Sequence, residues 1–216
     1  MLIDLSHTVE HGMVTYQGLP PPVISDFLTR EASRSRYAEG TEFHIGRIDM
    51  VANTGTYLDA PAHRFAEGAD IAAIELDQVA DLPATLVRAV GQPSIEAAMV
   101  RNLDLRGKAL LIHTGWSRHW RTETYFTNKH PFVTRGAAEA LARSGVRLVG
   151  IDSYNIDDTA DLTRPAHTEL LRAGVLIVEH LTNLEALPDS SGIRFFAIPV
   201  KVRGLGTFPV RAFAMV

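Results

Sequence analysis

The chain has 216 residues, of which 46% are hydrophobic, and its formal net charge is −4 at pH 7. This length and apolar content favour one sizeable core, so we expect residues 1–216 to form a single domain. A mildly acidic chain gives no reason to expect nucleic acid or an anionic membrane as a partner. The absence of cysteine excludes disulfides, thiolate metal sites and a cysteine nucleophile.

The N-terminus does not read as a signal peptide, because it has no basic region and carries Asp4 early. No apolar run reaches the roughly 18–20 residues that are needed to cross a bilayer. The sequence therefore predicts a cytoplasmic protein that does not span a membrane.

The first third of the chain is predicted to alternate strands with polar segments. Leu2–Val9 is expected to be a strand, and Phe43–Val51 alternates apolar and polar residues like a half-buried strand. Between them, Gly18–Pro22 is expected to be rigid and extended. The charged segment Arg30–Gly40 is expected to be a solvated loop or a frayed helix.

The middle third contains one strongly apolar strand and a long loop. Ile71–Val79 is weakly helical, Asp81–Pro83 is expected to break the chain before a strand over Leu86–Val90, and Ser94 is a candidate cap of a helix. The continuous apolar run Lys108–Thr114 is typical of a strand buried on both faces. The polar, aromatic-rich segment Trp116–Phe132 is expected to be a functional or partner-facing loop.

The last third carries the clearest helix, Thr134–Ser144, with Thr134 as its cap and Gly145 after its end. A shorter helix is expected over Pro165–Arg172. The strands expected around these helices are Val146–Asp152, Val175–Glu179, Ile193–Val200 and Val210–Met215. The repeated order of buried strands and helices indicates a mixed α/β domain.

One short stretch, Asn53–Phe65, combines a Gly-Thr turn with an Asp, a Pro and a His. Asp59 and His63 lie four residues apart, and Pro61 between them favours a fixed irregular turn over a helix. A loop that leaves a strand is a common place for functional side chains. The residues alone leave a simpler interpretation open, in which Asp59 caps a turn and His63 makes a loop hydrogen bond.

Two more candidate ligands lie far downstream. His167 belongs to the predicted helix Pro165–Arg172, and Glu179 ends a buried apolar run. A carboxylate at the end of a buried strand is costly unless it is paired, hydrogen-bonded or metal-bound. Asp, His and Glu together are a reasonable ligand set for Zn²⁺ or Mn²⁺, although spacing alone does not bring them together.

The stretch Asn53–Phe65 resembles the metal-binding signature of the cyclase family, which includes bacterial kynurenine formamidases and isatin hydrolases. That signature reads His-x-Gly-Thr-His-x-Asp-x-Pro-x-His. This chain has Asn53 and Tyr57 in place of the first two histidines. The positions that it keeps are Gly55, Thr56, Asp59, Pro61 and His63.

Later segments extend the resemblance in the same order as in the family. They include Pro165-Ala166-His167-Thr168-Glu169-Leu170-Leu171, Gly174, Val178-Glu179 and Leu181-Thr182-Asn183-Leu184. The match runs from Asp4 to the C-terminus. It implies an α/β fold with a single mixed-sheet domain, resembling the family's swivelling β/β/α fold.

The resemblance also implies roles for these residues. In dinuclear members one metal takes the two signature histidines and the Asp, and the other takes the same Asp, the downstream His and the downstream Glu. The second site is complete here as Asp59, His167 and Glu179, whereas Asn53 and Tyr57 weaken the first. His63 is then the acid/base, and Tyr57 either donates a hydrogen bond to a developing oxyanion or fills the altered site by packing.

The implied function is a metal-dependent hydrolase that acts on a C–N (amide or lactam) or ester bond of a small cyclic or aromatic substrate. It would use a single divalent metal, Zn or Mn, which polarises a carbonyl or acidifies a water. Tyr16, Asn53 and Phe65 are the candidate substrate contacts, and packing is the alternative role for Tyr16. The changed ligand positions argue against kynurenine formamidase itself.

Two other functions remain open at this point. One is a metal-free cyclase, isomerase or lyase that uses His63 and Tyr57, and the other is a non-catalytic relative that binds a small molecule. Family members assemble as dimers or tetramers, so a homodimer or homotetramer is expected. The Trp116–Phe132 loop and the C-terminal strand are the candidate contact surfaces.

Overall fold

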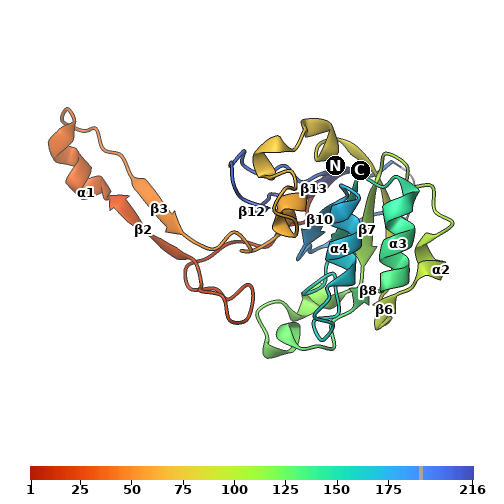
Figure 1. Cartoon of the computed structure of the whole chain (residues 1–216). Helices are drawn as coiled ribbons and strands as arrows, with labels where there is room; N and C mark the ends of the chain where they lie inside the picture. The colour runs from red at the N-terminus through yellow and green to blue at the C-terminus, as the bar shows by residue number, and fades with distance from the viewer. Residues whose placement is uncertain (190–191) are drawn as a thin grey trace.

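The computed structural model describes residues 1–189 and 192–216, and it shows a body built on one large sheet with a long arm projecting from it (Figure 1). In these residues the large sheet has nine strands. Their order across the sheet is β1 (Leu2–Asp4), β13 (Phe213–Met215), β11 (Arg194–Phe196), β5 (Leu82–Arg88), β7 (Ala109–His113), β9 (Leu148–Ile151), β10 (Leu176–Glu179), β4 (Tyr57–Asp59) and β12 (Thr207–Pro209). The expected mixed α/β fold is confirmed.

The centre of the sheet is parallel and its flanks are antiparallel. β5, β7, β9 and β10 run parallel to one another, whereas β4 pairs antiparallel with both β10 and β12. Every residue of β7, β9 and β10 is buried, as the continuous apolar runs predict. Leu110 and Ile112 pack into one core, and Ala109 and Leu111 pack into a second core on the other face.

Helices cover one face of the sheet. α3 (Arg135–Ser144) and α4 (Pro165–Arg172) pack side by side, and the short α2 (Ala97–Val100) lies beside α3 (Figure 1). The Thr134 side chain accepts a hydrogen bond from the Ala137 amide, and Gly145 ends α3 with φ +78°. Both helices have the predicted bounds, apart from Thr134, which is the cap and not the first helical residue.

The opposite face is covered by the sheet itself, which curls so that strands from its two ends share one core. That core contains Leu58 of β4 together with Phe195 of β11 and Ala214 of β13. Short 3₁₀ helices join these strands. They are η2 (Pro61–His63), η3 (Ile71–Ala73), η4 (Leu76–Gln78), η5 (Trp116–His119), η6 (Glu123–Phe126) and η7 (Leu184–Ala186).

The arm corrects the prediction for Phe43–Val51. A strand is present there as β3 (Ile45–Asp49), but all of its residues are exposed. Among the described residues β3 pairs only with β2 (Val23–Leu28), a strand that was not predicted, and the tip of the hairpin carries α1 (Arg30–Ser33) and η1 (Arg34–Arg36). The alternation of apolar and polar residues therefore reflects the two faces of an exposed ribbon.

Other differences concern the ends of elements. The first strand stops at Asp4 and does not continue to Val9. No break separates Asp81 from the strand that follows, because β5 already begins at Leu82 and includes Pro83. Ser94 does not cap a helix: it belongs to β6 (Ser94–Ile95), which pairs with β8 (Phe132–Val133), and Glu96 is the N-cap of α2. Strand β12 was not predicted.

Both predicted contact surfaces also make contacts within the chain. β13 lies between β1 and β11, so both of its edges are already paired. In the Trp116–Phe132 loop, Tyr125 is fully buried and its carbonyl accepts a hydrogen bond from Trp116 Nε1 at 3.1 Å. Within the described part of the chain, no helix is both long and apolar enough to cross a membrane.

Candidate active site

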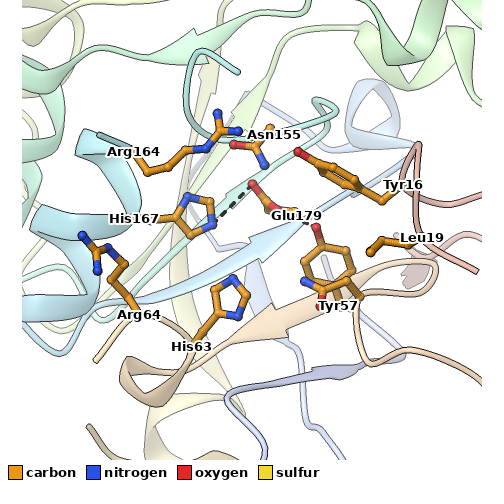
Figure 2. Close-up of a pocket in the computed structure, with 10 residues that line it drawn as sticks. Tyr16, Leu19, Tyr57, His63, Arg64, Asn155, Arg164, His167 and Glu179 are labelled. Atoms are coloured by element: carbon orange, nitrogen blue, oxygen red, sulfur yellow. Dashed lines mark hydrogen bonds and ion pairs between the residues drawn. The ribbon is translucent and has the colours of Figure 1, made fainter. Parts of the chain in front are cut away.

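The candidate site lies where strands β4 and β10 meet the N-terminal end of helix α4 (Figure 2). In the antiparallel register of these strands, Tyr57 is directly opposite Glu179 and Asp59 is opposite Ile177. Tyr57, Asp59 and Glu179 are all buried. The strand pairing therefore brings together residues that are more than a hundred positions apart in the sequence.

Asp59 is fully buried, and one of its oxygens has no hydrogen-bond partner among the described residues. Oδ1 accepts a hydrogen bond from the hydroxyl of Thr207, whereas Oδ2 has no hydrogen-bond partner among the described residues and lies 3.7 Å from Nε2 of His167. Burial raises the pKa of Asp59, but the imidazoles of His167 and His63 outweigh this effect and lower it. A buried carboxylate oxygen without a partner is costly, so this oxygen needs a cation.

His167 is held in place by a carboxylate behind it. Its Nδ1 lies 2.6 Å from Oδ2 of Asp157, and the two oxygens of Asp157 also accept hydrogen bonds from the backbone amides of Ala166 and His167. In the neutral ring that a metal ion requires, we assign the proton to Nδ1, which leaves the lone pair of Nε2 facing Asp59. Burial alone would lower the pKa of His167, but the bond to Asp157 and the charges of Glu179 and Asp59 raise it to about 10.

His63 ends the short helix η2, which Pro61 starts at its first position. Its Nδ1 lies 2.8 Å from Oγ1 of Thr207, and about a third of its side chain (34%) is exposed to the cavity. The backbone before β12 passes very close to η2. A Cβ atom added to Gly206 would lie 2.2 Å from the backbone nitrogen of His63. Gly206 thus lets Thr207 reach both Asp59 and His63.

Both carboxylate oxygens of Glu179 already accept hydrogen bonds. Its Oε2 accepts a hydrogen bond from the Tyr57 hydroxyl at 2.7 Å, and its Oε1 accepts one from the Ile156 amide at 2.6 Å. Oε1 is also 3.9 Å from Nε2 of His167. Burial raises the pKa of Glu179 to about 7, although the charge of His167 opposes the shift. Burial and the charges of Glu179 and Asp59 raise the pKa of Tyr57 well above its usual range.

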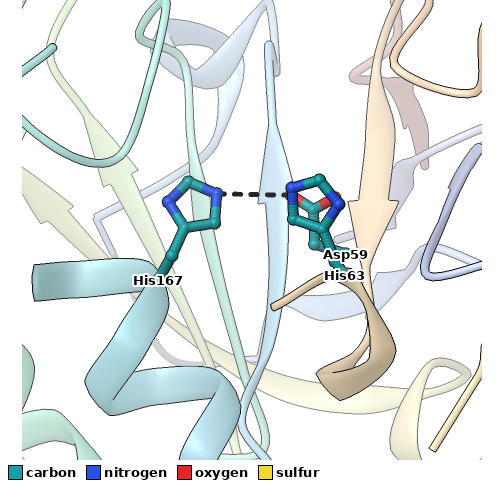
Figure 3. A group of neighbouring side chains, drawn as sticks. All are labelled: Asp59, His63 and His167. Atoms are coloured by element: carbon teal, nitrogen blue, oxygen red, sulfur yellow. Dashed lines mark ion pairs between the residues drawn. The ribbon is translucent and has the colours of Figure 1, made fainter. Parts of the chain in front are cut away.

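One group of side chains could hold a metal ion. Asp59, His63 and His167 offer ligand atoms that all lie within 4.8 Å of one another (Figure 3). Among the described residues no other group of three or more His, Cys, Asp or Glu side chains meets this condition. Two imidazoles and one carboxylate fit a borderline-soft divalent ion such as Zn²⁺. The unpartnered Oδ2 of Asp59 supports the same conclusion, so the residues present fit a metal.

A cavity of about 300 Å³ opens over this group (Figure 2). Tyr16 lies in its wall and packs against Tyr154, with the ring centroids 4.7 Å apart. The cavity is lined by one aliphatic side chain together with aromatic, charged and amide side chains: Leu19, Tyr16, Asn53, Tyr57, His63, Arg64, Asn155, Arg164, His167 and Glu179.

The predicted site residues therefore come together with one exception. Tyr16, Asn53, Tyr57, His63, His167 and Glu179 line the cavity, and Asp59 lies buried next to His63 and His167. Phe65 does not line it. Its ring packs between the guanidinium groups of Arg64 and Arg172, which lie 5.5 Å and 5.4 Å from the ring centroid, and against the core beneath the helices.

Sequence reasoning missed two groups that orient the histidines. Thr207 comes from strand β12, which gave no strand signal, and nothing in its neighbourhood in the sequence pointed to the site. Asp157 was expected only to line the pocket or to cap a strand end. Its signal was weak, because an acid between a buried strand and a helix has many possible uses, and only the fold shows that its carboxylate faces His167.

Comparison with known proteins places this chain in a family. A family model described as "Putative cyclase" matches residues 3–158. The kynurenine formamidase of Geobacillus thermodenitrificans (strain NG80-2) is 31% identical over 211 residues, which cover 97% of this chain and 95% of that protein.

Solved structures give the same result. A protein described as a potential metal-dependent hydrolase with cyclase activity superposes with a TM-score of 0.80 at 29% identity, over 99% of this chain and 96% of that chain. Isatin hydrolase A from Labrenzia aggregata, bound to benzyl benzoate, superposes with a TM-score of 0.82 at 20% identity, over 100% of this chain and 93% of that chain. At this low identity the second likeness concerns the fold.

Proposed function

This chain belongs to the cyclase family, and from that membership we propose that it is a metal-dependent hydrolase of a C–N (amide or lactam) or ester bond in a small cyclic or aromatic substrate. The observation that carries the proposal is the buried Oδ2 of Asp59, which has no hydrogen-bond partner among the described residues and faces Nε2 of His167. A divalent cation between these two atoms satisfies both of them.

Zn²⁺ or Mn²⁺ suits a site of one carboxylate and imidazole nitrogens. Such an ion supplies Lewis acidity, which polarises a carbonyl group and acidifies a water molecule. The chain's own residues prepare the site for it. Asp157 holds the proton of His167 on Nδ1, and Thr207 fixes both the Asp59 carboxylate and the His63 ring.

The cavity supports a small substrate. A volume of about 300 Å³ is at the lower end of the range for small-molecule sites, and Tyr16 offers an aromatic wall on which a planar ring can pack. Asn53 lines the same space and its side-chain amide can donate a hydrogen bond to a carbonyl oxygen, whereas the one proton of the Tyr57 hydroxyl is donated to Glu179. Arg64 and Arg164 also line the cavity and favour a substrate that carries a negative group.

The changed signature argues for a substrate different from that of the kynurenine formamidases. In the cyclase signature both changed positions carry histidine, and here they are Asn53 and Tyr57. Both residues line the cavity, so the change alters the surface that a substrate contacts. We therefore propose a related acyl-transfer reaction to water on another small amide, lactam or ester.

A metal-free acid/base enzyme is the second candidate, and one feature of the site favours it. The carboxylates around His167 raise its pKa to about 10, so a protonated imidazole can neutralise them without a metal ion. His63 and Tyr57 would then serve a cyclase, isomerase or lyase reaction.

The two candidates are separated by metal content and by hydrolysis of a panel of aryl amides, lactams and aryl esters. Protein purified without chelator is expected to carry about one metal ion per chain, and Asp59→Asn and His167→Asn are expected to lose both the ion and the hydrolysis. Loss of activity in His63→Ala, together with full activity in EDTA, would support the metal-free candidate instead. If the protein carries no metal and turns over none of these substrates, the remaining interpretation is a relative that binds a small molecule without catalysis.

We also propose that the protein is a homodimer or homotetramer. The support is the arm of residues 23–49, in which Leu28 is buried but most large apolar side chains are exposed. Seven of them are exposed: Val23, Ile24, Phe27, Tyr37, Phe43, Ile45 and Ile48. A two-stranded ribbon is marginally stable alone, so contacts with a second copy would stabilise it.

A further inference from the structure

In the family pattern His63 is the acid/base and Glu179 is a metal ligand; an exchange at the metal would put His63 in the place of Glu179. We propose that the metal is bound by Asp59, His63 and His167, and that Glu179 is not a ligand but positions the hydroxyl of Tyr57. This inference rests on the proposed metal-dependent function, and it concerns which side chains hold the ion.

The first argument is the tautomer of His63. Thr207 has a single hydroxyl proton, which it donates to Oδ1 of Asp59, so its oxygen can only accept from the ring nitrogen 2.8 Å away. The proton of a neutral His63 is therefore on Nδ1, and Nε2 keeps a free lone pair. Metal-binding histidines usually donate their other nitrogen in this way, and His167 does the same through Asp157.

The second argument is distance. Metal bonds of about 2.0–2.1 Å at tetrahedral angles place neighbouring ligand atoms about 3.3–3.5 Å apart. Oδ2 of Asp59 and Nε2 of His167 are 3.7 Å apart, and His63 completes a set of atoms that lie within 4.8 Å of one another. In the described residues, Asp59, His167 and Glu179 do not form such a set.

The third argument is the state of Glu179. Its two oxygens accept hydrogen bonds of 2.7 Å from Tyr57 and 2.6 Å from the Ile156 amide, so neither is left without a partner as Oδ2 of Asp59 is. A ligand role would require these contacts to be broken or shared. Asp59 and His63, in contrast, can bind a metal and keep their bonds to Thr207.

The fourth argument links this exchange to the altered signature. Tyr57 stands where the signature has a histidine, and the strand register places it directly opposite Glu179. A phenol is a poor ligand but a good donor to a carboxylate, so the substitution turns two ligand positions into one hydrogen-bonded pair. Because Tyr57 also lines the cavity, the pair fixes a hydroxyl at the place where a substrate would lie.

Metal content of variants tests the exchange without relying on activity. After loading with Zn²⁺ and removal of the excess, His63→Ala is expected to lose the metal, whereas Glu179→Gln and Tyr57→Phe are expected to keep about one ion per chain. His44→Ala is the control for non-specific binding, since this histidine lies on the exposed arm and pairs with Asp26. Loss of metal in Glu179→Gln with retention in His63→Ala would overturn the exchange.

A second measurement uses the wild-type protein and avoids variants that do not fold. The X-ray absorption fine structure of the Zn²⁺-loaded protein is expected to show two imidazole ligands. A single imidazole would overturn the exchange while leaving the metal-dependent function intact. A wild-type protein that takes up no metal from Zn²⁺ or Mn²⁺ would overturn the metal-dependent function as well, so the two failures differ.

Discussion

Single residues around the site act through the histidines that they orient. Asp157 and Thr207 bind the Nδ1 atoms of His167 and His63, and each leaves the opposite nitrogen free. Neither was assigned this role from the sequence, whereas Asp59, His63 and His167 were singled out by type and by the signature around them. The difference is physical, because an orienting group can come from any strand that passes the site.

Asp157→Asn tests the orienting role. The amide can still accept a bond from Nδ1, but it lacks the charge that favours the correct tautomer and a basic Nε2. We expect metal affinity to fall by about 10–100-fold, as measured by competition with a chromophoric chelator, and thermal stability to fall as well, because one of the two Asp157 oxygens that accept backbone amide bonds becomes an NH2 donor. Asp158→Asn is the matched control, since among the described residues its half-buried carboxylate accepts a hydrogen bond only from the nearby Ala160 amide. Equal affinities in both variants would show that Asp157 does not orient His167.

His7 allows a prediction for the effect of acid. Burial and, to a smaller extent, the charge of Arg121 lower the pKa of this histidine from 6.5 to about 4; its ring stacks on that of Trp120, with the centroids 3.9 Å apart. Between these two pH values only the unfolded chain takes up the proton, so the free energy of unfolding falls as pH drops below about 6.5.

His7→Phe keeps the stacking and removes the titration. The variant is expected to lose less stability than the wild type between pH 8 and pH 5, as measured by urea unfolding at both values. An identical loss in both proteins would mean that His7 does not contribute to acid sensitivity.

Secondary-structure elements were predicted well where local signals agreed with the fold. Helix α4 has the predicted bounds, α3 begins after its predicted cap, and β7 and β10 are buried as their apolar runs indicate. The predictions failed for elements whose burial depends on which distant segments pack against them, because a local sequence pattern does not reveal those segments. The alternation of β3 looked half-buried but belongs to a free arm, and β12 is too short to produce a pattern.

The close approach of β12 to η2 gives a prediction at this scale. Gly206→Ala places a Cβ 2.2 Å from the backbone nitrogen of His63 and 2.5 Å from its Cα. The segment before β12 and helix η2 must therefore separate. We expect a loss of about 1–3 kcal/mol in the free energy of unfolding and a larger proportional loss of metal affinity, because both Thr207 and His63 move.

Gly136→Ala is the matched control for Gly206→Ala. Gly136 lies within α3, and a Cβ there would meet nothing closer than Ala97 at 3.8 Å. Alanine is the better helix residue, so this variant should gain about 0.5–1 kcal/mol in the free energy of unfolding. Chemical denaturation measures both, and a Gly206→Ala protein as stable as the wild type would contradict the predicted clash.

The whole molecule consists of a body that holds the site and an arm that extends away from it (Figure 1). Ile24 and Ile48 face each other in the register of the arm, and both are exposed. We expect the double change Ile24→Asp and Ile48→Asp to reduce the assembly to monomers in light scattering, without loss of bound metal. Leu76→Asp, at an exposed apolar site on the body, should leave the assembly unchanged. An arm variant that keeps its wild-type mass would exclude the arm as the contact.

The central claim is that a metal ion held by Asp59 and His167 is required for hydrolysis. The direct measurement removes the metal with a chelator, restores it in graded amounts of Zn²⁺ or Mn²⁺, and follows hydrolysis of the amide, lactam and ester panel at each metal content. We predict no hydrolysis in the metal-free protein and activity that rises in proportion to bound metal up to about one ion per chain. Full hydrolysis by the metal-free protein would contradict the account.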